Sequence, residues 1–403
     1  MTDRVSAVQA WLEDRAEAMA TLLMELVAIP TENPPGRDLG RCADHLRGAI
    51  DRLGFGAEMI EVEPSGQQEG SAVVRATIGD GPEVVYYHGH FDVVPAQSRS
   101  QFLPTRRGGR ILGRGTADMK GGLVCMLYGA AAAAEFRLLD DRRIVLHFVC
   151  DEETGSTSGS GHLRSSGLIE PGALAMLTAE PTGGVVWHAN RGAVTLRVNV
   201  AGREAHVGQV HLGVNAFELM IRIAAPLASL SLELLQKRTA FRLDSDEARG
   251  SMLVVGGQAG AGVNFNAVPG SAWFSVDRRF NPEEDLEQEV KRLTSTIASA
   301  AEAVGAEVQV EVLQLQPSGS TEASHPAAHA LSACVREVEG MEPTFEMCPG
   351  VLDTRWYSQL GIPAFAYGAG LLDVSHGPDE FIDEAAMRRC AEVYALFAGQ
   401  VPR

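Results

Sequence analysis

The sequence predicts an α/β fold in which helices cover both faces of a mixed sheet, with a smaller α+β unit inserted into the chain. Helical patterns alternate with apolar, β-branched runs over residues 1–191. The run "RIVLHFVC" is almost entirely apolar, as expected of a central strand buried on both faces. From about residue 192 the strands alternate in polarity instead, which indicates a separate unit.

The first part of the chain supplies the elements of the main sheet. Helices are predicted near 5–28, 38–54 and 121–137, and strands near 57–63, 71–78, 84–88, 143–150 and within 173–182. Four of these strands end in polar loops. Open α/β sheets place their sites at the edge where such loops meet, so we expect polar residues to gather there.

The inserted unit is predicted over 192–316. Its strands are "AVTLRVNVAG", "SAWFSVDRRF" and "AEVQVEVLQ", and its helices lie near 214–229 and 283–304, which favours two helices on an antiparallel sheet. After the turn-rich stretch "QPSGSTEASHP", a helix at 327–338, the strand "PAFAYG" and a helix at 383–398 return to the first domain. The predicted domains are therefore 1–191 with 317–403, and 192–316.

Composition excludes several classes of partner. The 403 residues include 34 Lys and Arg against 52 Asp and Glu, a formal charge of −18 with no basic stripe, so nucleic acid and anionic membranes are poor partners. Charges interrupt the N-terminal apolar positions, and no stretch resembles a signal peptide or a membrane span. Six scattered cysteines without a CxxC pair indicate a reduced, cytoplasmic protein.

Five polar residues at the ends of predicted elements form a candidate metal site. They are two histidines and three acids, each in a short polar motif: His90 in "HGHFDVVP", Asp118 in "GRGTADMKGG", Glu153 in "CDEETGS", Glu180 in "TAEPTGG" and His376 in "DVSHGPDE". Two imidazoles and three carboxylates can hold a pair of borderline cations, with one carboxylate bridging. One shared site is a simpler explanation than five coincidental placements.

Each motif alone has an ordinary alternative. Asp118 could cap a helix, and His88 is better explained as a hydrogen-bonded core residue than as a ligand. His90 gains support from Asp92, because metal-bound imidazoles usually donate their other N–H to a carboxylate. The adjacent acids Glu152 and Glu153 repel each other unless a cation or a shared proton is present. Glu152 points the other way along an extended backbone and is free to act as a base.

Together these motifs resemble a known family. The fragments "GHFDVVP", "GRGTADMKGG", "DEETGS", "AEPT", "RGAVTLRVNVAGREAHVG", "NAVPG", "DRR" and "SHGPDE" follow in the order found in the co-catalytic zinc amidohydrolases. That family includes acetylornithine deacetylase, succinyl-diaminopimelate desuccinylase, glutamate carboxypeptidase and aminoacylase. The resemblance covers nearly the whole chain and implies a zinc-peptidase-like catalytic domain with an inserted ferredoxin-like lid.

The resemblance also implies roles for the metal-site residues. His90 and Glu180 would hold one divalent ion, Glu153 and His376 the other, and Asp118 would bridge them. The ions would be zinc, with cobalt or manganese possible. Glu152 would be the general base for a water activated by the two metals, and Asp92 would orient His90. A cis peptide bond is expected between Asp118 and Met119.

In the inserted unit the resemblance implies a lid that also forms a homodimer. His206 in "GREAHVG" would reach into the partner subunit's site and stabilise an oxyanion. Asn266 and Arg279 would meet a carboxylate on the substrate, and Arg191 is a third candidate. Alternatives remain for both arginines: Arg279 could pair with Asp277, and Arg191 could form a hinge salt bridge.

One segment departs from the family pattern. Where many members have a Gly-Gly-Thr/Ser-Ser-Asp loop, this chain reads "CPGVLDTR", and Val351 and Leu352 make that part of the substrate pocket more apolar. Desuccinylase and acetylornithine deacetylase activities are therefore in doubt.

The expected reaction is hydrolysis of an amide C–N bond in a small carboxylate-bearing molecule, foremost an N-acyl amino acid. The alternatives are a dipeptidase or carboxypeptidase, or an unusual C–N hydrolase such as a deaminase or decarbamoylase. A non-catalytic binding protein is disfavoured, because the ligands and the base are all present.

Overall fold

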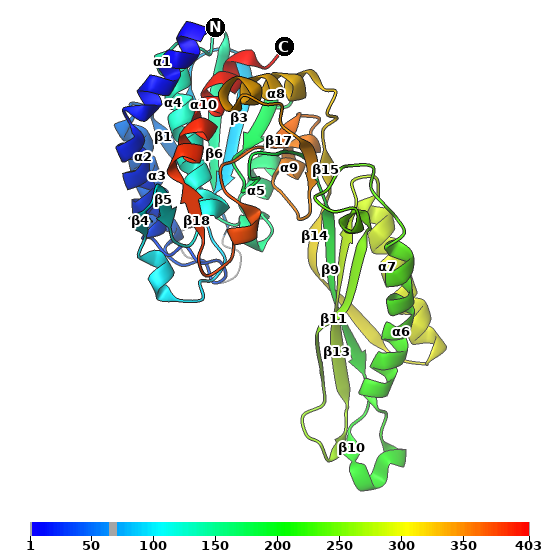
Figure 1. The fold of residues 1–403 in the computed structure, drawn as a ribbon. Helices are drawn as coiled ribbons and strands as arrows, with labels where there is room; N and C mark the ends of the chain where they lie inside the picture. Colours follow the sequence, from blue (N-terminus) through cyan, green and yellow to red (C-terminus); the bar gives the residue numbers. More distant parts are fainter. Residues whose placement is uncertain (1, 64–70, 403) are drawn as a thin grey trace. The chain divides into compact units, whose positions relative to one another are not determined.

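The computed structural model describes residues 2–63 and 71–402. They divide into two compact units (Figure 1). The first comprises Met1–His188, Ser320–Glu346 and Leu352–Arg403; the second comprises Ala189–Gly319 and Met347–Val351. The division proposed from the sequence, 1–191 with 317–403 and 192–316, differs from these units by three residues at each border and by 347–351, which group with the second unit. Within that unit, Met347 packs with Ala189 and Leu243 in a small apolar cluster.

A large mixed sheet forms the centre of the first unit, as predicted. Its strand order is β1-β2-β6-β3-β7-β17-β8-β15, with β16 beside β8. The strands β6, β3, β7 and β17 run parallel, whereas β1, β2 and β8 are antiparallel to their neighbours. The bounds are β1 Ala57–Glu61, β2 Ala72–Ile78, β3 Glu83–His90, β6 Arg142–Val149, β7 Ala175–Thr178, β8 Val186–Asn190, β15 Gly319–Ser320, β16 Phe345–Cys348 and β17 Ala364–Ala366.

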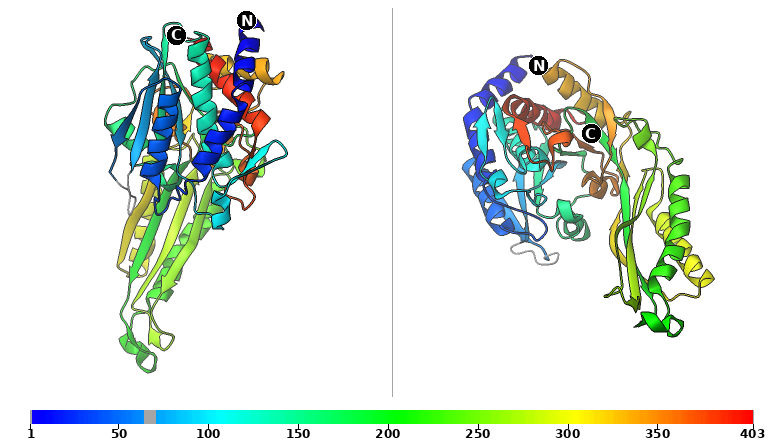
Figure 2. Two further views of the ribbon diagram at one scale, coloured as in Figure 1. Left: turned by 90° about the vertical axis from the view of Figure 1, so that its left-hand side faces the viewer. Right: turned by 60° about the horizontal axis from the view of Figure 1, so that its bottom comes forward.

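Helices cover both faces of this sheet (Figures 1 and 2). Successive residues of a strand point to opposite faces. The rings of the neighbouring, fully buried Tyr86 and Tyr87 of β3 accordingly contact those of Tyr357 in α9 and Tyr394 in α10, in tilted and edge-to-face arrangements. The helices are α1 Thr2–Glu13, α2 Ala16–Val27, α3 Leu39–Arg52, α4 Gly121–Glu135, α5 Ser160–Ser165, α8 Pro326–Glu339, α9 Thr354–Ser358 and α10 Glu384–Gln400.

Two local predictions were wrong. The single helix expected near 5–28 is two helices, α1 and α2, and the charged residues 13–15 lie at the turn between them. Arg15 Nη1 donates to the carbonyl oxygen of Trp11, so a side chain satisfies one of the last carbonyls of α1. Strand β11 Met252–Ala261 was not predicted, because glycines interrupt its apolar pattern.

The second unit is an antiparallel sheet, β11-β13-β9-β14, with two helices against it (Figure 1). Strand β9 Gly192–Ala201 pairs with both β13 Ser271–Phe280 and β14 Val308–Gln316. Helices α6 Ala216–Leu234 and α7 Leu286–Ala303 pack on it and share an apolar core of their own. A short pair, β10 Ala205–His206 with β12 Ala267–Val268, lies apart from the main sheet.

A small three-stranded sheet completes the first unit. Strand β5 Arg110–Leu112 pairs with β4 Thr105–Arg107 on one side and with β18 Phe381–Asp383 on the other. This pairing brings the residues after β5 close to the residues before β18. All six cysteines are buried, and none of them forms a disulfide. In the described part of the chain, no helix is long and apolar enough to cross a membrane.

Candidate active site

The parallel strands place most of the candidate ligands at one edge of the main sheet. His90 is the last residue of β3, and Glu180 lies two residues after β7. Glu152 and Glu153 follow β6 in a 3₁₀ turn, which corrects the extended backbone expected for them. Asp118 lies in the irregular turn Thr116–Lys120 that leads into α4. The Asp118–Met119 peptide bond is cis, as predicted.

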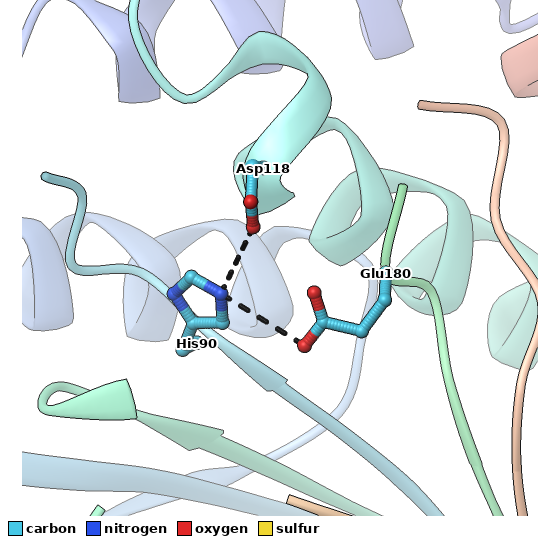
Figure 3. Close-up of side chains that lie close together, drawn as sticks. All are labelled: His90, Asp118 and Glu180. Atoms are coloured by element: carbon cyan, nitrogen blue, oxygen red, sulfur yellow. Dashed lines mark ion pairs between the residues drawn. The ribbon is translucent and has the colours of Figure 1, made fainter. Parts of the chain in front are cut away.

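His90, Asp118 and Glu180 form the first group of candidate ligands (Figure 3). His90 Nε2 lies 3.3 Å from Asp118 Oδ1 and 3.9 Å from Glu180 Oε1. All three ligand atoms of the group are within 4.8 Å of one another. His90 and Glu180 are buried. This arrangement has the donor set of a divalent-cation site.

The second group shares Asp118 with the first and adds Glu153 and His376. His376 Nε2 lies 3.3 Å from Asp118 Oδ2 and 3.4 Å from Glu153 Oε1. The two carboxylate oxygens of Asp118 therefore face two different imidazoles. The geometry brings all five predicted ligands together, with Asp118 common to both groups.

The residues present fit a pair of cations. Glu153 Oε1 is buried and accepts no hydrogen bond from the described residues. His376 Nε2, 3.4 Å away, compensates this oxygen only when the imidazole is protonated, and a bound cation would take over that role. Imidazole nitrogens together with carboxylate oxygens are ligands that zinc and similar ions prefer.

In the absence of a cation the three glutamates of the site have raised pKa values, whereas contacts with His376 and His90 lower the pKa of Asp118 despite its burial. Burial raises the pKa of Glu180 to about 8. The charges of Asp118 and Glu153 act in the same direction, whereas the charge of His90 lowers this pKa. Burial also raises the pKa of Glu153, and it raises the pKa of Glu152 well above its usual value. Contacts with Asp118 and Glu153 raise the pKa of His376 to about 10. A bound cation would therefore have to displace protons from this site.

Asp92 lies behind His90 and orders two parts of the site. His90 Nδ1 is 3.0 Å from the Asp92 carbonyl oxygen and 3.3 Å from Oδ1, so this ring nitrogen faces both acceptors. The carboxylate of Asp92 also accepts hydrogen bonds from the backbone N–H groups of Glu152 and Glu153, at 3.1 and 3.2 Å. The orienting contact to His90 is thus shared between main chain and side chain.

The sequence did not identify Asp353 as part of the site's support. Its buried carboxylate accepts hydrogen bonds from the hydroxyls of Ser156 and Ser160, both at 2.5 Å. His88 Nε2 lies 2.8 Å from the same carboxylate, so His88 is the hydrogen-bonded core residue that the sequence indicated. Asp353 therefore fixes the loop that follows Glu152 and Glu153. The only signal was its position in "CPGVLDTR", which was interpreted through Val351 and Leu352.

The remaining predicted residues belong to the second unit. His206 is exposed, and its Nδ1 accepts a hydrogen bond from the Gly208 N–H at 3.1 Å. The carbonyl of the exposed Asn266 accepts from the Val207 N–H, so His206 and Asn266 lie on adjoining segments. Val351, half-buried, groups with this unit.

Both candidate substrate-binding arginines have partners within the second unit. Arg279 donates to Asp277 through Nε and Nη2, at 2.7 and 3.2 Å, which is the pairing that the sequence left open. Arg191 is buried, and its Nη groups donate to Asn281 and to the Ala248 carbonyl, both at 2.5 Å. Its partners are thus an amide and a carbonyl instead of the acid of a salt bridge.

Comparison with known proteins matches the model of Peptidase family M20/M25/M40 to residues 86–400. The N-formyl-4-amino-5-aminomethyl-2-methylpyrimidine deformylase of Bacillus subtilis is 24% identical, over 94% of this chain and 93% of its own length. A putative succinyl-diaminopimelate desuccinylase of Mycobacterium tuberculosis is 26% identical, over 94% and 97%. The M20 family metallo-carboxypeptidase Sso-CP2 of Sulfolobus solfataricus has the same fold, with a TM-score of 0.79 at 18% identity, covering 95% of this chain and 99% of that one.

Proposed function

Because the chain belongs to peptidase family M20/M25/M40, whose members hydrolyse amide bonds, we propose that it is a metal-dependent deacylase of a small carboxylate-bearing substrate, foremost an N-acyl amino acid. The observation that carries this proposal is the sharing of Asp118 between two His and carboxylate groups. The deformylase and desuccinylase relatives both carry names for removal of an acyl group, which supports deacylation.

His90 and Glu180 would hold one cation, Glu153 and His376 the other, and Asp118 would contact both. We propose zinc, with cobalt or manganese as alternatives, because the donors are imidazoles and carboxylates without thiolate. Cations bound there would acidify a water and polarise the scissile carbonyl. Asp92 keeps His90 in the tautomer whose Nε2 lone pair faces the site, because Nδ1 faces two acceptors.

Glu152 is the general base of the proposed reaction. Its backbone N–H donates a hydrogen bond to the Asp92 carboxylate, and burial raises the pKa of its side chain well above the usual value of a glutamate. A carboxylate tuned in this direction can take a proton from water and return it to the leaving nitrogen. The proton then moves between Glu152 and the amine, and the acyl product keeps the oxygen.

His206 is proposed to stabilise the oxyanion in the site of a partner subunit. Its Nδ1 accepts the Gly208 amide, so in the neutral ring the proton lies on Nε2, where it can be donated. Homodimer formation through the second unit is supported by exposed apolar side chains there, among them Phe217 and Ile221 of α6. Sedimentation should give a dimer, and an active monomer would contradict this part of the proposal.

Arg279 and Asn266 are proposed to bind the substrate carboxylate, since a guanidinium recognises carboxylates through two hydrogen bonds. The substrate carboxylate would then replace the carboxylate of Asp277 as the partner of Arg279. Arg191 is a weaker candidate because Asn281 and Ala248 already accept from its Nη groups. Val351 would line an apolar part of the pocket. Free buried thiols fit a reducing compartment, so we propose that the protein is cytoplasmic.

The proposal is tested by amine release from N-acyl amino acids, dipeptides and aryl amides, using protein stripped of metal and reloaded with zinc, cobalt or manganese. We expect metal-dependent hydrolysis of N-acyl amino acids. Preferential cleavage of dipeptides would instead favour the peptidase alternative. If the metal-loaded protein releases amine from none of these compounds, the substrate would contain a different C–N bond, such as that of a carbamoyl group.

A further inference from the structure

We propose that the buried pair Arg114 and Glu380 is a positioning pair for the metal centre. It ties the backbone at Asp118 to the backbone at His376 and thereby sets the cation affinity of the group that these two residues share with Glu153. This inference rests on the proposed function and extends it to two residues that carry no ligand atom themselves.

The small sheet brings the two residues together from distant parts of the chain. In the antiparallel pair β5 and β18, Phe381 lies opposite Leu112. The Gly113 N–H donates to the Glu380 carbonyl at 3.0 Å, which continues the pairing by one step. Arg114 and Glu380 therefore lie side by side between the turn that carries Asp118 and the loop that carries His376.

Glu380 holds the Asp118 turn. One carboxylate oxygen, Oε1, accepts hydrogen bonds from the backbone N–H groups of Ala117 and Asp118, at 2.9 and 3.2 Å. The other oxygen, Oε2, accepts from Arg114 Nη1 at 2.6 Å. Both side chains are buried, with 1% of each residue exposed. Charge-assisted hydrogen bonds in such a setting fix geometry more firmly than neutral ones.

Arg114 holds the His376 loop. Its Nη2 donates to the carbonyl oxygen of His376 at 3.1 Å. His376 has φ of +61°, a left-handed conformation that a histidine keeps only where its surroundings enforce it. The side chain of Gln101 also restrains this loop, because its Nε2 donates a hydrogen bond to the carbonyl oxygen of Gly377 at 3.0 Å. Without these donors the exposed imidazole of His376 would have little to fix its direction.

The pair acts through geometry, and one substitution separates this from an effect of charge. Arg114 and Glu380 together are neutral, so their net field on a cation is small. If charge alone mattered, Arg114→Met would remove a nearby positive charge and tighten cation binding. If the pair positions Asp118 and His376, the same substitution releases both segments and weakens binding.

The test is titration of metal-free protein with Zn²⁺ by calorimetry and with Co²⁺ by visible absorption, in the wild type, Arg114→Met and Glu380→Gln. Outer-shell partners of metal ligands typically change affinity by about 10- to 100-fold. We expect a loss of that size, with an altered Co²⁺ spectrum, in the step that fills the group of Asp118, Glu153 and His376 for both variants. Because Asp118 also belongs to the other group, Glu380→Gln should weaken the other step as well. Arg143→Met is the matched control, since Arg143 also pairs with a glutamate and donates to backbone carbonyls, but away from the site.

The double variant Arg114→Met/Glu380→Gln keeps the inference testable if a single variant unfolds, because a neutral pair avoids an isolated buried charge. It still lacks the donor to His376, so we expect it to fold and to lose affinity in the same step. Unchanged or tighter binding in folded Arg114→Met or in the double variant overturns the inference. If the wild type itself binds no pair of cations, the proposed function fails first, and the two failures are thereby distinguished.

Discussion

The carboxylate of Asp118 faces two imidazoles, and three glutamates lie around it. Burial and mutual repulsion raise the pKa values of Glu152, Glu153 and Glu180. Such a cluster destabilises an empty scaffold, and cation binding would turn it into a stabilising one. Glu152 differs from the other two because it belongs to neither group of candidate ligands.

This difference gives the first prediction. Glu152→Gln should lower kcat by about 10²- to 10⁴-fold, because the amide cannot take a proton from water. Metal content and thermal stability should stay close to the wild type, which elemental analysis and circular dichroism would measure. Glu170→Gln, a change in a partly exposed ion pair with Arg143, is the control and should leave kcat unchanged. A Glu152→Gln variant with full turnover would remove Glu152 from the mechanism.

At the level of elements, glycines let the segments that carry ligands touch through their backbones. A Cβ at Gly122, near the start of α4, would lie 2.3 Å from the carbonyl oxygen of Ala179, next to Glu180. A Cβ at Gly368 would lie 2.1 Å from the carbonyl oxygen of Glu180 itself. Only glycine permits so close an approach, so these two glycines allow the backbones around them to pack directly against the segment Ala179 to Glu180.

We therefore expect Gly122→Ala to push the Glu180 segment away and to weaken cation binding by about tenfold or more, while lowering the melting temperature. Calorimetric titration and thermal unfolding would measure the two effects. Gly48→Ala in α3 is the control, because its Cβ would meet only Arg52 Nη1 at 3.6 Å. That variant should gain up to about 1 kcal/mol of stability from helix propensity, with normal metal binding. Equal behaviour of both variants would refute the role assigned to Gly122.

The contact between α8 and α10 gives a pH prediction. Burial raises the pKa of Glu392 to about 7, and Glu339 and Glu337 of α8 act in the same direction. Between pH 4.5 and about 7 the unfolded chain loses this proton while the folded chain keeps it, so stability falls as pH rises through that window.

Glu392→Gln should remove this loss and raise the melting temperature at pH 8 by several degrees, with little change at pH 4.5. Thermal unfolding across that range is the measurement. Glu302→Gln, at an exposed site in the second unit, should leave the pH profile unchanged. A Glu392 variant whose pH profile parallels the wild type would show that the carboxylate is ionised without cost in the fold.

At the scale of the whole molecule, each of the two units has a large apolar core formed by its described residues. All the candidate metal ligands lie in the first unit, whereas His206, Asn266 and Arg279 lie in the second. The proposed metal binding and the proposed recognition of the carboxylate and oxyanion are thus assigned to different compact units of one chain.

We expect calorimetric unfolding to show two transitions, of which only one moves with metal. Zinc at about 100 times its Kd should stabilise the first unit by about 2.7 kcal/mol, and a chelator should reverse this. Asp118→Asn, which weakens both groups of ligands at once, should abolish the shift while leaving the second transition in place. A metal-dependent shift of both transitions would contradict the assignment of the whole metal site to the first unit.

Sequence alone predicted the fold class correctly, and it named five candidate ligands that the structure brings close together, because strand ends and short motifs are local patterns. Polar residues that directly follow apolar strands converge wherever those strands run parallel, so the cluster could be expected before any coordinates. Burial, hydrogen bonding and the register of edge strands depend on partners far away in sequence. Strand β11 was not predicted because its glycines interrupt the apolar pattern, and its pairing depends on the distant strand β13.

Only the tertiary structure decided which residues support the ligands. Glu380 contacts Asp118 across 262 positions, and Ser156 contacts Asp353 across 197, so neither pairing leaves a local pattern to recognise. Likewise the partners of Arg191, which are Asn281 and the Ala248 carbonyl, lie 90 and 57 positions away, whereas the partner of Arg279 is the nearby Asp277. Sequence determined which side chains are candidates for the chemistry, because strand ends and glycine turns are encoded locally; long-range packing decided what holds them in place.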